Sequence, residues 1–298
     1  MIRTLVLTLY APMLGALLFC AEAPAHAERI PRAVIADATP DRAHPARQEV
    51  VHIPTAGLEI NGLALVASGA GPHPAFVLFH GLPGNEKNLD LAQSVRRAGW
   101  TVVTINYRGS WGSPGAFRFA NTLDDARATL AHLRRPDIAA KLSIDPARIA
   151  VGGHSMGGWV TAHTLAADPA LLGGVMISAG DLGRASHAPP ERHAELVAFM
   201  NESRETLNGA TGETMVDELL GSHAEWSLPA LAPVLKDRRV LVLYSADFVQ
   251  ADSESFIAAL RGAGATQLQT RFAETDHSWS DKRIALQASV VSWLDNLR

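Results

Sequence analysis

From residue 48 onward, short apolar runs alternate with helical patterns, and this alternation restricts the fold more than any other feature. The expected strands contain few polar residues, which indicates a sheet covered on both faces. Repeated strand–helix–strand units imply parallel pairing with right-handed crossovers. The expected strands are 49–53, 58–66, 75–80, 101–107, 148–152, 173–179, 239–245 and 267–272, and the expected helices are 89–98, 122–135, 155–167, 253–262 and 281–297. We therefore predict an α/β domain with a mostly parallel central sheet over residues 48–298.

Residues 181–237 break this alternation because they contain no good strand. Helical patterns at 191–207 and 213–220 are separated by Asn208-Gly209, and prolines and glycines bound the segment. A long insertion between two core strands is commonly a lid over a site. We therefore expect a helical cap here, with a surface excursion of no function as the alternative.

Residues 1–27 have the layout of a secretory signal peptide. The apolar run 5–19 is shorter than the roughly 20 residues of a membrane span, and small residues at Ala25 and Ala27 mark an expected cleavage after Ala27. We predict a secreted or periplasmic protein without stable membrane insertion; an uncleaved anchor is the alternative. Residues 28–47 are rich in Pro, Ala, Arg and Asp and are expected to form an extended arm.

Composition removes several classes of partner and cofactor. The chain of 298 residues carries 26 Lys+Arg against 30 Asp+Glu, a net charge of -4, so it has no basic field for a nucleic acid. Cys20 is the single cysteine, which excludes an internal disulfide and a multi-cysteine zinc site. We expect no nucleic-acid partner, no metal and no organic cofactor, and the sequence leaves the oligomeric state open.

The segment Gly153-His154-Ser155-Met156-Gly157 matches the pattern G-x-S-x-G. It follows one expected strand and opens the next expected helix, which places its serine on a tight strand-to-helix turn. The serine hydroxyl is then exposed above the sheet, at the positive end of a helix. We predict that Ser155 is a nucleophile; a plain helix N-cap is the alternative.

A nucleophilic serine needs a base, and the base needs an orienting carboxylate. His277 follows the last expected strand, and Asp247 follows the strand before it. Both residues therefore lie at carboxyl ends of strands, where open α/β sheets bind ligands. Asp252 is the alternative acid, although its position is typical of the N-cap of the following helix.

An oxyanion also needs backbone donors, and the loop that starts at His80-Gly81-Leu82 directly follows a strand. In this arrangement one N–H comes from the residue after the nucleophile, Met156, and the other comes from the earlier loop, for which Leu82 is the candidate. A glycine- and proline-rich loop that only turns the chain is the alternative.

Together these residues resemble the α/β-hydrolase family of serine hydrolases, over about residues 48–298. The resemblance implies that Ser155 is the nucleophile, His277 the general base and then acid, and Asp247 the orienting carboxylate, with Leu82 and Met156 as oxyanion donors. One feature departs from the family pattern. The family often has a glycine and two more residues before its acid, whereas the segment Ser245-Ala246-Asp247 is shorter.

The stretch 106–112 also looks like one seen in prolyl-oligopeptidase-like and related secreted hydrolases of this family. It is expected to line the site, unless Arg108 only pairs with Asp124 or Asp125 for structure. The residues expected to contact the substrate are His80, Gly81, Tyr107 and Trp111. The tryptophans that can line a pocket or simply fill the core are Trp111, Trp159, Trp226 and Trp279.

The resulting prediction is a carboxylic ester hydrolase that acts on a small acyl substrate through an acyl-enzyme. A serine peptidase or amidase acting on short peptides is the first alternative. In the prolyl-oligopeptidase relatives a large propeller domain selects short peptides. The chain has no room for such a domain, which weakens the peptidase alternative. A catalytically silent α/β-hydrolase fold used for binding is the second alternative.

Overall fold

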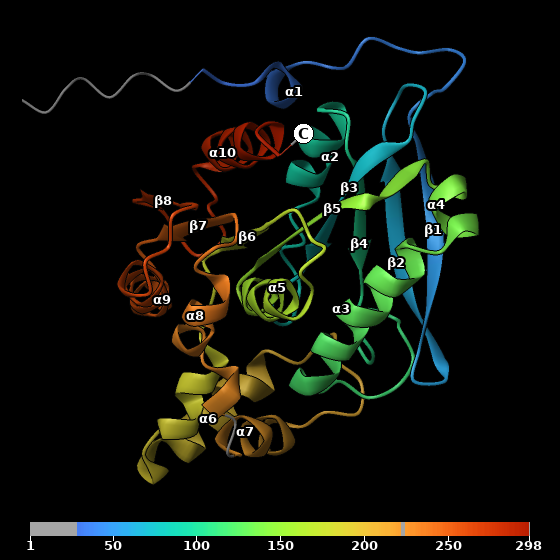
Figure 1. The fold of residues 1–298 in the computed structure, drawn as a ribbon. Coiled ribbons are helices and arrows are strands. Elements are labelled where there is room, and N and C mark those ends of the chain that lie inside the picture. The colour runs from blue at the N-terminus through green and yellow to red at the C-terminus, as the bar shows by residue number, and fades with distance from the viewer. Residues whose placement is uncertain (1–28, 222–223, 298) are drawn as a thin grey trace, which may run out of the picture.

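Eight strands form one sheet in the order β1-β2-β4-β3-β5-β6-β7-β8 in the computed structural model, which describes residues 29–221 and 224–297 (Figure 1). The strands are β1 (Arg47–Thr55), β2 (Leu58–Val66), β3 (His73–Phe79), β4 (Thr101–Ile105), β5 (Ile144–His154), β6 (Gly174–Ile177), β7 (Val240–Ser245) and β8 (Leu268–Ala273). β2 pairs antiparallel with β1 and with β4, and all other pairs are parallel. The prediction of a mostly parallel α/β sheet is confirmed.

Helices cover both faces of this sheet because each face carries its own apolar cluster. One cluster joins the sheet to α3, α5 and α9, and the other joins it to α2 and α10. The α-helices are α1 (Arg32–Ile35), α2 (Leu89–Arg97), α3 (Phe119–Leu133), α4 (Pro136–Lys141), α5 (Met156–Ala167), α6 (His193–Glu202), α7 (Gly212–Leu220), α8 (Ala232–Leu235), α9 (Gln250–Gly262) and α10 (Arg283–Asp295). Short 3-10 turns are η1 (Leu182–His187), η2 (Pro190–Arg192), η3 (Ala224–Trp226) and η4 (Pro229–Leu231).

Strand register brings four loops to one edge of the sheet. Phe79 on β3 pairs with Gly153 on β5, and Ser245 on β7 pairs with Ala273 on β8. The loops that follow these strands therefore leave from the same edge, because parallel strands end on the same side. This edge carries the residues that the sequence singles out for catalysis.

The insertion between β6 and β7 is helical, and α6 and α7 pack on each other below the sheet in Figure 1. Among the helix boundaries that differ from the sequence prediction, two depend on this cap. α3 begins at Phe119 because the Glu218 carboxylate accepts the N–H groups of Phe119 and Ala120, each at 3.0 Å. α6 ends at Glu202 rather than 207, because Leu207 forms an antiparallel bridge with Ser110 instead.

The arm before the sheet packs on the domain. Its helix α1 contacts α2 and α10, and the Arg97 side chain donates to the carbonyl oxygen of Ala33 at 2.6 Å. The predicted signal peptide, 1–27, lies outside the described residues. Within the described part of the chain, no helix is both long enough and apolar enough to span a membrane.

Candidate active site

Ser155 occupies the turn between β5 and α5 with φ 56° and ψ -121°, a conformation that residues other than glycine rarely adopt. A Cβ atom on Gly153 would lie 2.2 Å from the carbonyl oxygen of Gly157, so the turn closes only with glycine there. Ser155 sits at the N-cap position of α5, but its side chain makes no capping bond among the described residues. The tight turn expected from G-x-S-x-G is therefore present, and the hydroxyl is not used to cap the helix.

Asp247 and His277 are joined by a hydrogen bond of 2.8 Å from Nδ1 of the imidazole to Oδ2 of the carboxylate. Burial raises the pKa of Asp247, but the bonds from His277, Ser245 and the Val249 N–H outweigh it and leave the pKa below its ordinary value. Because the carboxylate only accepts, Nδ1 is the donor of this bond, and in the neutral imidazole the free lone pair is then on Nε2. This is the protonation that a general base requires.

A buried chain of polar contacts supports this pair, and sequence reasoning did not identify it. The indole N–H of Trp279 donates to Oγ of Ser178 at 3.0 Å, and Oγ of Ser178 lies 2.7 Å from Oγ of Ser245. Ser245 in turn donates to Asp247 at 2.7 Å. The available signal was Trp279 itself, because a buried indole N–H needs an acceptor.

Asp252, the alternative acid, is placed elsewhere. It lies in the first turn of α9, which begins at Gln250, so it is not the N-cap that its position suggested. Its Oδ2 accepts the N–H of Asp181 at 3.2 Å, and its Oδ1 lies 2.8 Å from the Arg184 guanidinium. It thus holds the start of the cap, while His277 bonds to Asp247.

The loop after β3 lies directly against the serine. A Cβ atom on Gly81 would lie 2.9 Å from Cβ of Ser155. Nδ1 of His80 donates to the carbonyl oxygen of Gly81 at 2.7 Å, and in a trans peptide the next N–H, that of Leu82, points the opposite way. Met156 is the first residue of α5, where N–H groups have no partner within the helix. The arrangement is compatible with Leu82 and Met156 as oxyanion donors, and their role stays a prediction.

Two of the residues expected to contact substrate have buried side chains. His80 and Tyr107 are 3% and 0% exposed, and the Tyr107 hydroxyl donates to the His80 carbonyl oxygen at 3.4 Å. Both side chains therefore pack inside the protein and support the loop that follows β3. Trp111 is partly exposed at the rim, where its indole N–H donates to the Pro83 carbonyl oxygen at 2.8 Å. Of the four tryptophans considered for a pocket, Trp159, Trp226 and Trp279 are buried in the core.

His154, the residue before the serine, connects the two halves of the site. Its Nε2 donates to the backbone oxygen of His277 at 2.8 Å, and the two rings lie 4.6 Å apart. Burial, with the nearby His277, lowers the pKa of His154 to about 3, so the ring is neutral. This bond ties the turn that carries Ser155 to the loop that carries His277.

The neutral His154 predicts an acid-sensitive contribution to stability. An unfolded chain protonates this imidazole near its ordinary pKa of 6.5, whereas the folded protein does so near 3. Stability is therefore lost as pH falls through this window, by about 1.4 kcal/mol per pH unit from this group. His154→Gln lacks the titration, so the free-energy advantage of the native chain over the variant shrinks on acidification. Urea unfolding of both proteins between about pH 7 and about pH 5 measures it; an advantage independent of pH contradicts it.

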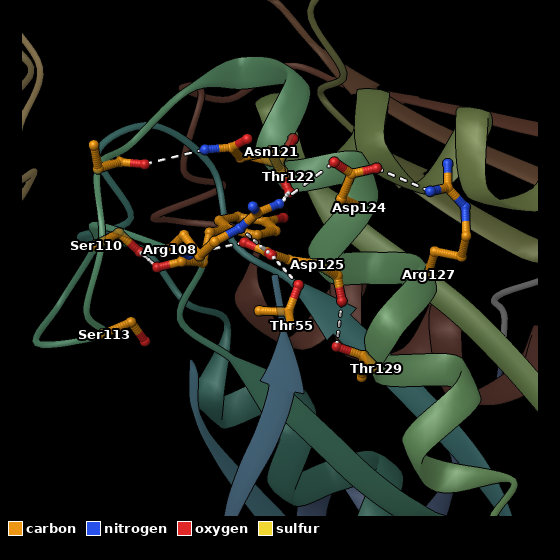
Figure 2. A network of polar contacts seen from close by, with 12 residues as sticks. Thr55, Arg108, Ser110, Ser113, Asn121, Thr122, Asp124, Asp125, Arg127 and Thr129 are labelled. Atoms are coloured by element: carbon orange, nitrogen blue, oxygen red, sulfur yellow. Dashed lines mark hydrogen bonds and ion pairs between the residues drawn. The ribbon is translucent and has the colours of Figure 1, made fainter. Parts of the chain in front are cut away.

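The loop 106–112 is fixed by a buried ion pair, which Figure 2 shows with its neighbours. Nε of Arg108 donates to Oδ1 of Asp125 at 2.6 Å, and the Arg108 N–H donates to Oδ2 at 2.8 Å. Thr55 on β1 donates to the same carboxylate at 3.0 Å, while Asp124 lies farther from the guanidinium, at 3.5 Å. Arg108 therefore has the structural role that the sequence left open as an alternative.

Removing Asp125 is expected to cost far more stability than removing its neighbour. Asp125→Ala leaves the nearly buried Arg108 cation without its main partner, which typically costs about 3–5 kcal/mol. Asp124→Ala removes a half-exposed carboxylate from the same helix and is expected to cost less than about 1 kcal/mol. Urea unfolding compares the two variants, and equal losses would refute this assignment.

The cap is hydrogen-bonded to both loops that flank the site. Thr206 donates to the Pro83 carbonyl oxygen at 3.1 Å and its own carbonyl accepts the N–H of Trp111 at 3.1 Å. The Asn208 N–H donates to the Gly109 carbonyl oxygen at 2.7 Å, and the Asn208 carbonyl oxygen accepts the Phe117 N–H at 2.9 Å. The segment 205–208 is therefore a fixed side of the site in this structure.

Metal ligands are not grouped in the residues that the structure describes: no three His, Cys, Asp or Glu side chains lie together as a potential metal site. A serine in a strained strand-to-helix turn and a carboxylate-bound imidazole at the same sheet edge are features typical of α/β hydrolase folds.

Residues 76–286 match the model of the Alpha/beta hydrolase family. The chain belongs to this family of hydrolases. In sequence, an uncharacterized protein of Mycobacterium tuberculosis is 31% identical over 114 residues, which is 38% of this chain and only 39% of that relative. The chain thus matches about two fifths of the length of that relative.

Two solved structures share the fold. The acylaminoacyl peptidase of Pyrococcus horikoshii superposes with a TM-score of 0.66 and 16% identity, over 84% of this chain and 41% of that chain. The hyperthermophilic esterase of Pyrobaculum calidifontis gives 0.61 and 18%, over 85% of this chain and 87% of that chain. At such identities the likeness concerns the fold alone.

Proposed function

We propose that this protein is a serine hydrolase of carboxylic esters with Ser155, His277 and Asp247 as its catalytic triad. The observation that carries the proposal is the 2.8 Å bond between Asp247 and His277 at the sheet edge where Ser155 occupies its strained turn. Family membership supports hydrolysis as the reaction class. The choice of esters over amides is the part that experiment has to decide.

In the proposed mechanism, Nε2 of His277 takes the hydroxyl proton as Oγ of Ser155 forms a bond to the acyl carbon. The carbonyl electron pair moves to oxygen, where the N–H groups of Leu82 and Met156 stabilise it. His277 then gives its proton to the departing alkoxide as the bond from carbon to that oxygen breaks. Water, activated by the same imidazole, hydrolyses the acyl-enzyme and restores the serine. Asp247 stays ionised and stabilises the imidazolium.

A fluorophosphonate probe tests the nucleophile, and paired substrates test the bond. We expect one adduct, located on Ser155 by mass spectrometry, and turnover of short acyl esters well above turnover of the matching peptide amides. Turnover of amides over esters would overturn the ester proposal and favour a peptidase. A folded protein without an adduct would overturn the serine mechanism and favour a binding protein.

We also propose a secreted or periplasmic location, on the basis of residues 1–27. Mass analysis of the protein exported by a bacterial host tests it, and the expected mature chain starts at Glu28. A chain that retains residues 1–27 would contradict cleavage.

A further inference from the structure

Phe248 is the most exposed of the large apolar side chains described, at 67%, and it directly follows Asp247. Its ring centroid lies 4.5 Å from that of His277, with the planes at 42°. An isolated exposed phenylalanine is ordinary on a protein surface. This one lies against the imidazole that the proposed mechanism uses, so its exposed area borders the reaction.

The two neighbours of the His277 ring differ in accessibility. His154 lies 4.6 Å away and is 4% exposed, so it closes one side of the imidazole with protein. Phe248, whose ring centroid lies 4.5 Å from that of His277, is open to solvent. Of these two rings, Phe248 is therefore the one that a substrate group next to His277 can contact.

The chemistry of His277 identifies which part of the substrate this is. Nδ1 is bound to Asp247, so Nε2 is the nitrogen that gives a proton to the leaving oxygen. That oxygen must come within hydrogen-bond reach of the imidazole, while the acyl oxygen is held at the oxyanion donors. The alcohol side of an ester is thus the part that passes beside Phe248.

The backbone around Phe248 is fixed, so the ring can act as a permanent surface. Asp247 donates its N–H to the Ser245 carbonyl oxygen at 2.9 Å, and Val249 donates to Oδ1 of Asp247 at 2.9 Å. Val249 is buried, and a Cβ atom on Gly180 would touch it at 3.4 Å. α9 begins immediately afterwards at Gln250.

We propose that Phe248 forms the leaving-group subsite and makes the enzyme prefer esters of apolar, ring-bearing alcohols. The inference rests on the proposed ester hydrolysis and adds the class of alcohol that the site selects. An aromatic or apolar alcohol buries the exposed ring and gains ring contacts, whereas methanol covers little of it. Discrimination of this kind in an apolar pocket is typically about 10- to 200-fold.

The test compares Phe248→Ala, Phe248→Tyr and the native protein on benzyl acetate and methyl acetate, with acid release followed by titration. Taking each variant's kcat/KM relative to the native protein cancels the intrinsic reactivity of each ester. We expect Phe248→Ala to reduce the benzyl-to-methyl ratio about tenfold, and Phe248→Tyr to preserve it. Phe272→Ala is the matched control, because Phe272 is also an exposed ring but packs on Tyr244, and its ratio should not change.

A second series varies the acyl group in methyl esters, from acetate to hexanoate. The proposal predicts that Phe248→Ala changes kcat/KM by the same factor on every methyl ester of this series. Equal loss on benzyl and methyl acetate would overturn the subsite and show that Phe248 only supports His277. A change confined to the acyl series would overturn it in favour of an acyl-side role. Native protein that hydrolyses neither acetate would instead overturn the ester function itself, and the subsite with it.

Discussion

Ser155→Ala is expected to lower kcat on the preferred ester by about 10⁴- to 10⁶-fold. The loss is this large because alanine removes the atom that would form the acyl-enzyme, and the backbone donors alone supply only residual catalysis. Ser155 has no capping bond among the described residues and sits at a positive φ of 56°. The substitution therefore removes little that the fold depends on.

Stopped assays with high enzyme concentration measure the residual rate, and urea unfolding measures stability on the same sample. We expect the unfolding free energies of the native protein and Ser155→Ala to agree within about 1 kcal/mol. Ser110→Ala is a suitable control, because Ser110 is a nearby buried serine that bonds to the Tyr107 carbonyl oxygen at 3.1 Å. A Ser155→Ala protein that keeps more than about a tenth of the native kcat would exclude Ser155 as nucleophile.

Asp247→Asn is expected to reduce kcat by about 10³- to 10⁴-fold, with a smaller effect on KM. Asn presents an amide that can donate to Nδ1, which favours the tautomer whose Nε2 carries a proton and cannot accept one. Asp247 is 4% exposed, so water does not readily replace the lost contact with His277. The variant keeps the volume of the side chain, which separates tautomer control from packing.

Asp252→Asn is the comparison that distinguishes the two carboxylates. Asp252 is also buried, but it holds Arg184 and the N–H of Asp181 at the start of the cap. Asp252→Asn should lower the stability of the protein and alter kcat less than about tenfold. The measurement is kcat of both variants from acidic to alkaline pH, with the folding of each variant checked by circular dichroism. A larger kcat loss in Asp252→Asn than in Asp247→Asn would reverse the assignment of the acid.

The central sheet could be predicted from the sequence because its determinants are local. Buried strands such as β3 and β7 are continuous apolar runs, and parallel strands need crossover helices between them. The serine turn was predictable for the same reason. Gly153 is needed because a Cβ atom there would meet the Gly157 carbonyl oxygen, an approach within five residues of chain, whereas Gly157 is needed because the Phe79 carbonyl oxygen of β3 lies against it.

Helix ends were less predictable where their partners come from the cap. α3 gains its first turn because Glu218, 99 positions from Phe119, accepts the N–H groups that no nearby side chain caps. The last five residues of the predicted helix 191–207 are not helical because Leu207 and its neighbours pair with the loop after β4. Such contacts join segments that are far apart in the sequence, so local hydrophobic periodicity does not predict them.

The sequence by itself determined the parallel α/β fold, the serine turn and the candidates for base and acid, because strand periodicity, glycine sterics and the position of polar residues at strand ends are properties of short segments. Only the tertiary structure decided that His277 bonds to Asp247 rather than Asp252. It also decided that Arg108 is a structural cation held by Asp125, and that the rings of His154 and Phe248 both contact the imidazole. These outcomes depend on distances between residues brought together from separate strands, and the register of a folded sheet fixes those distances.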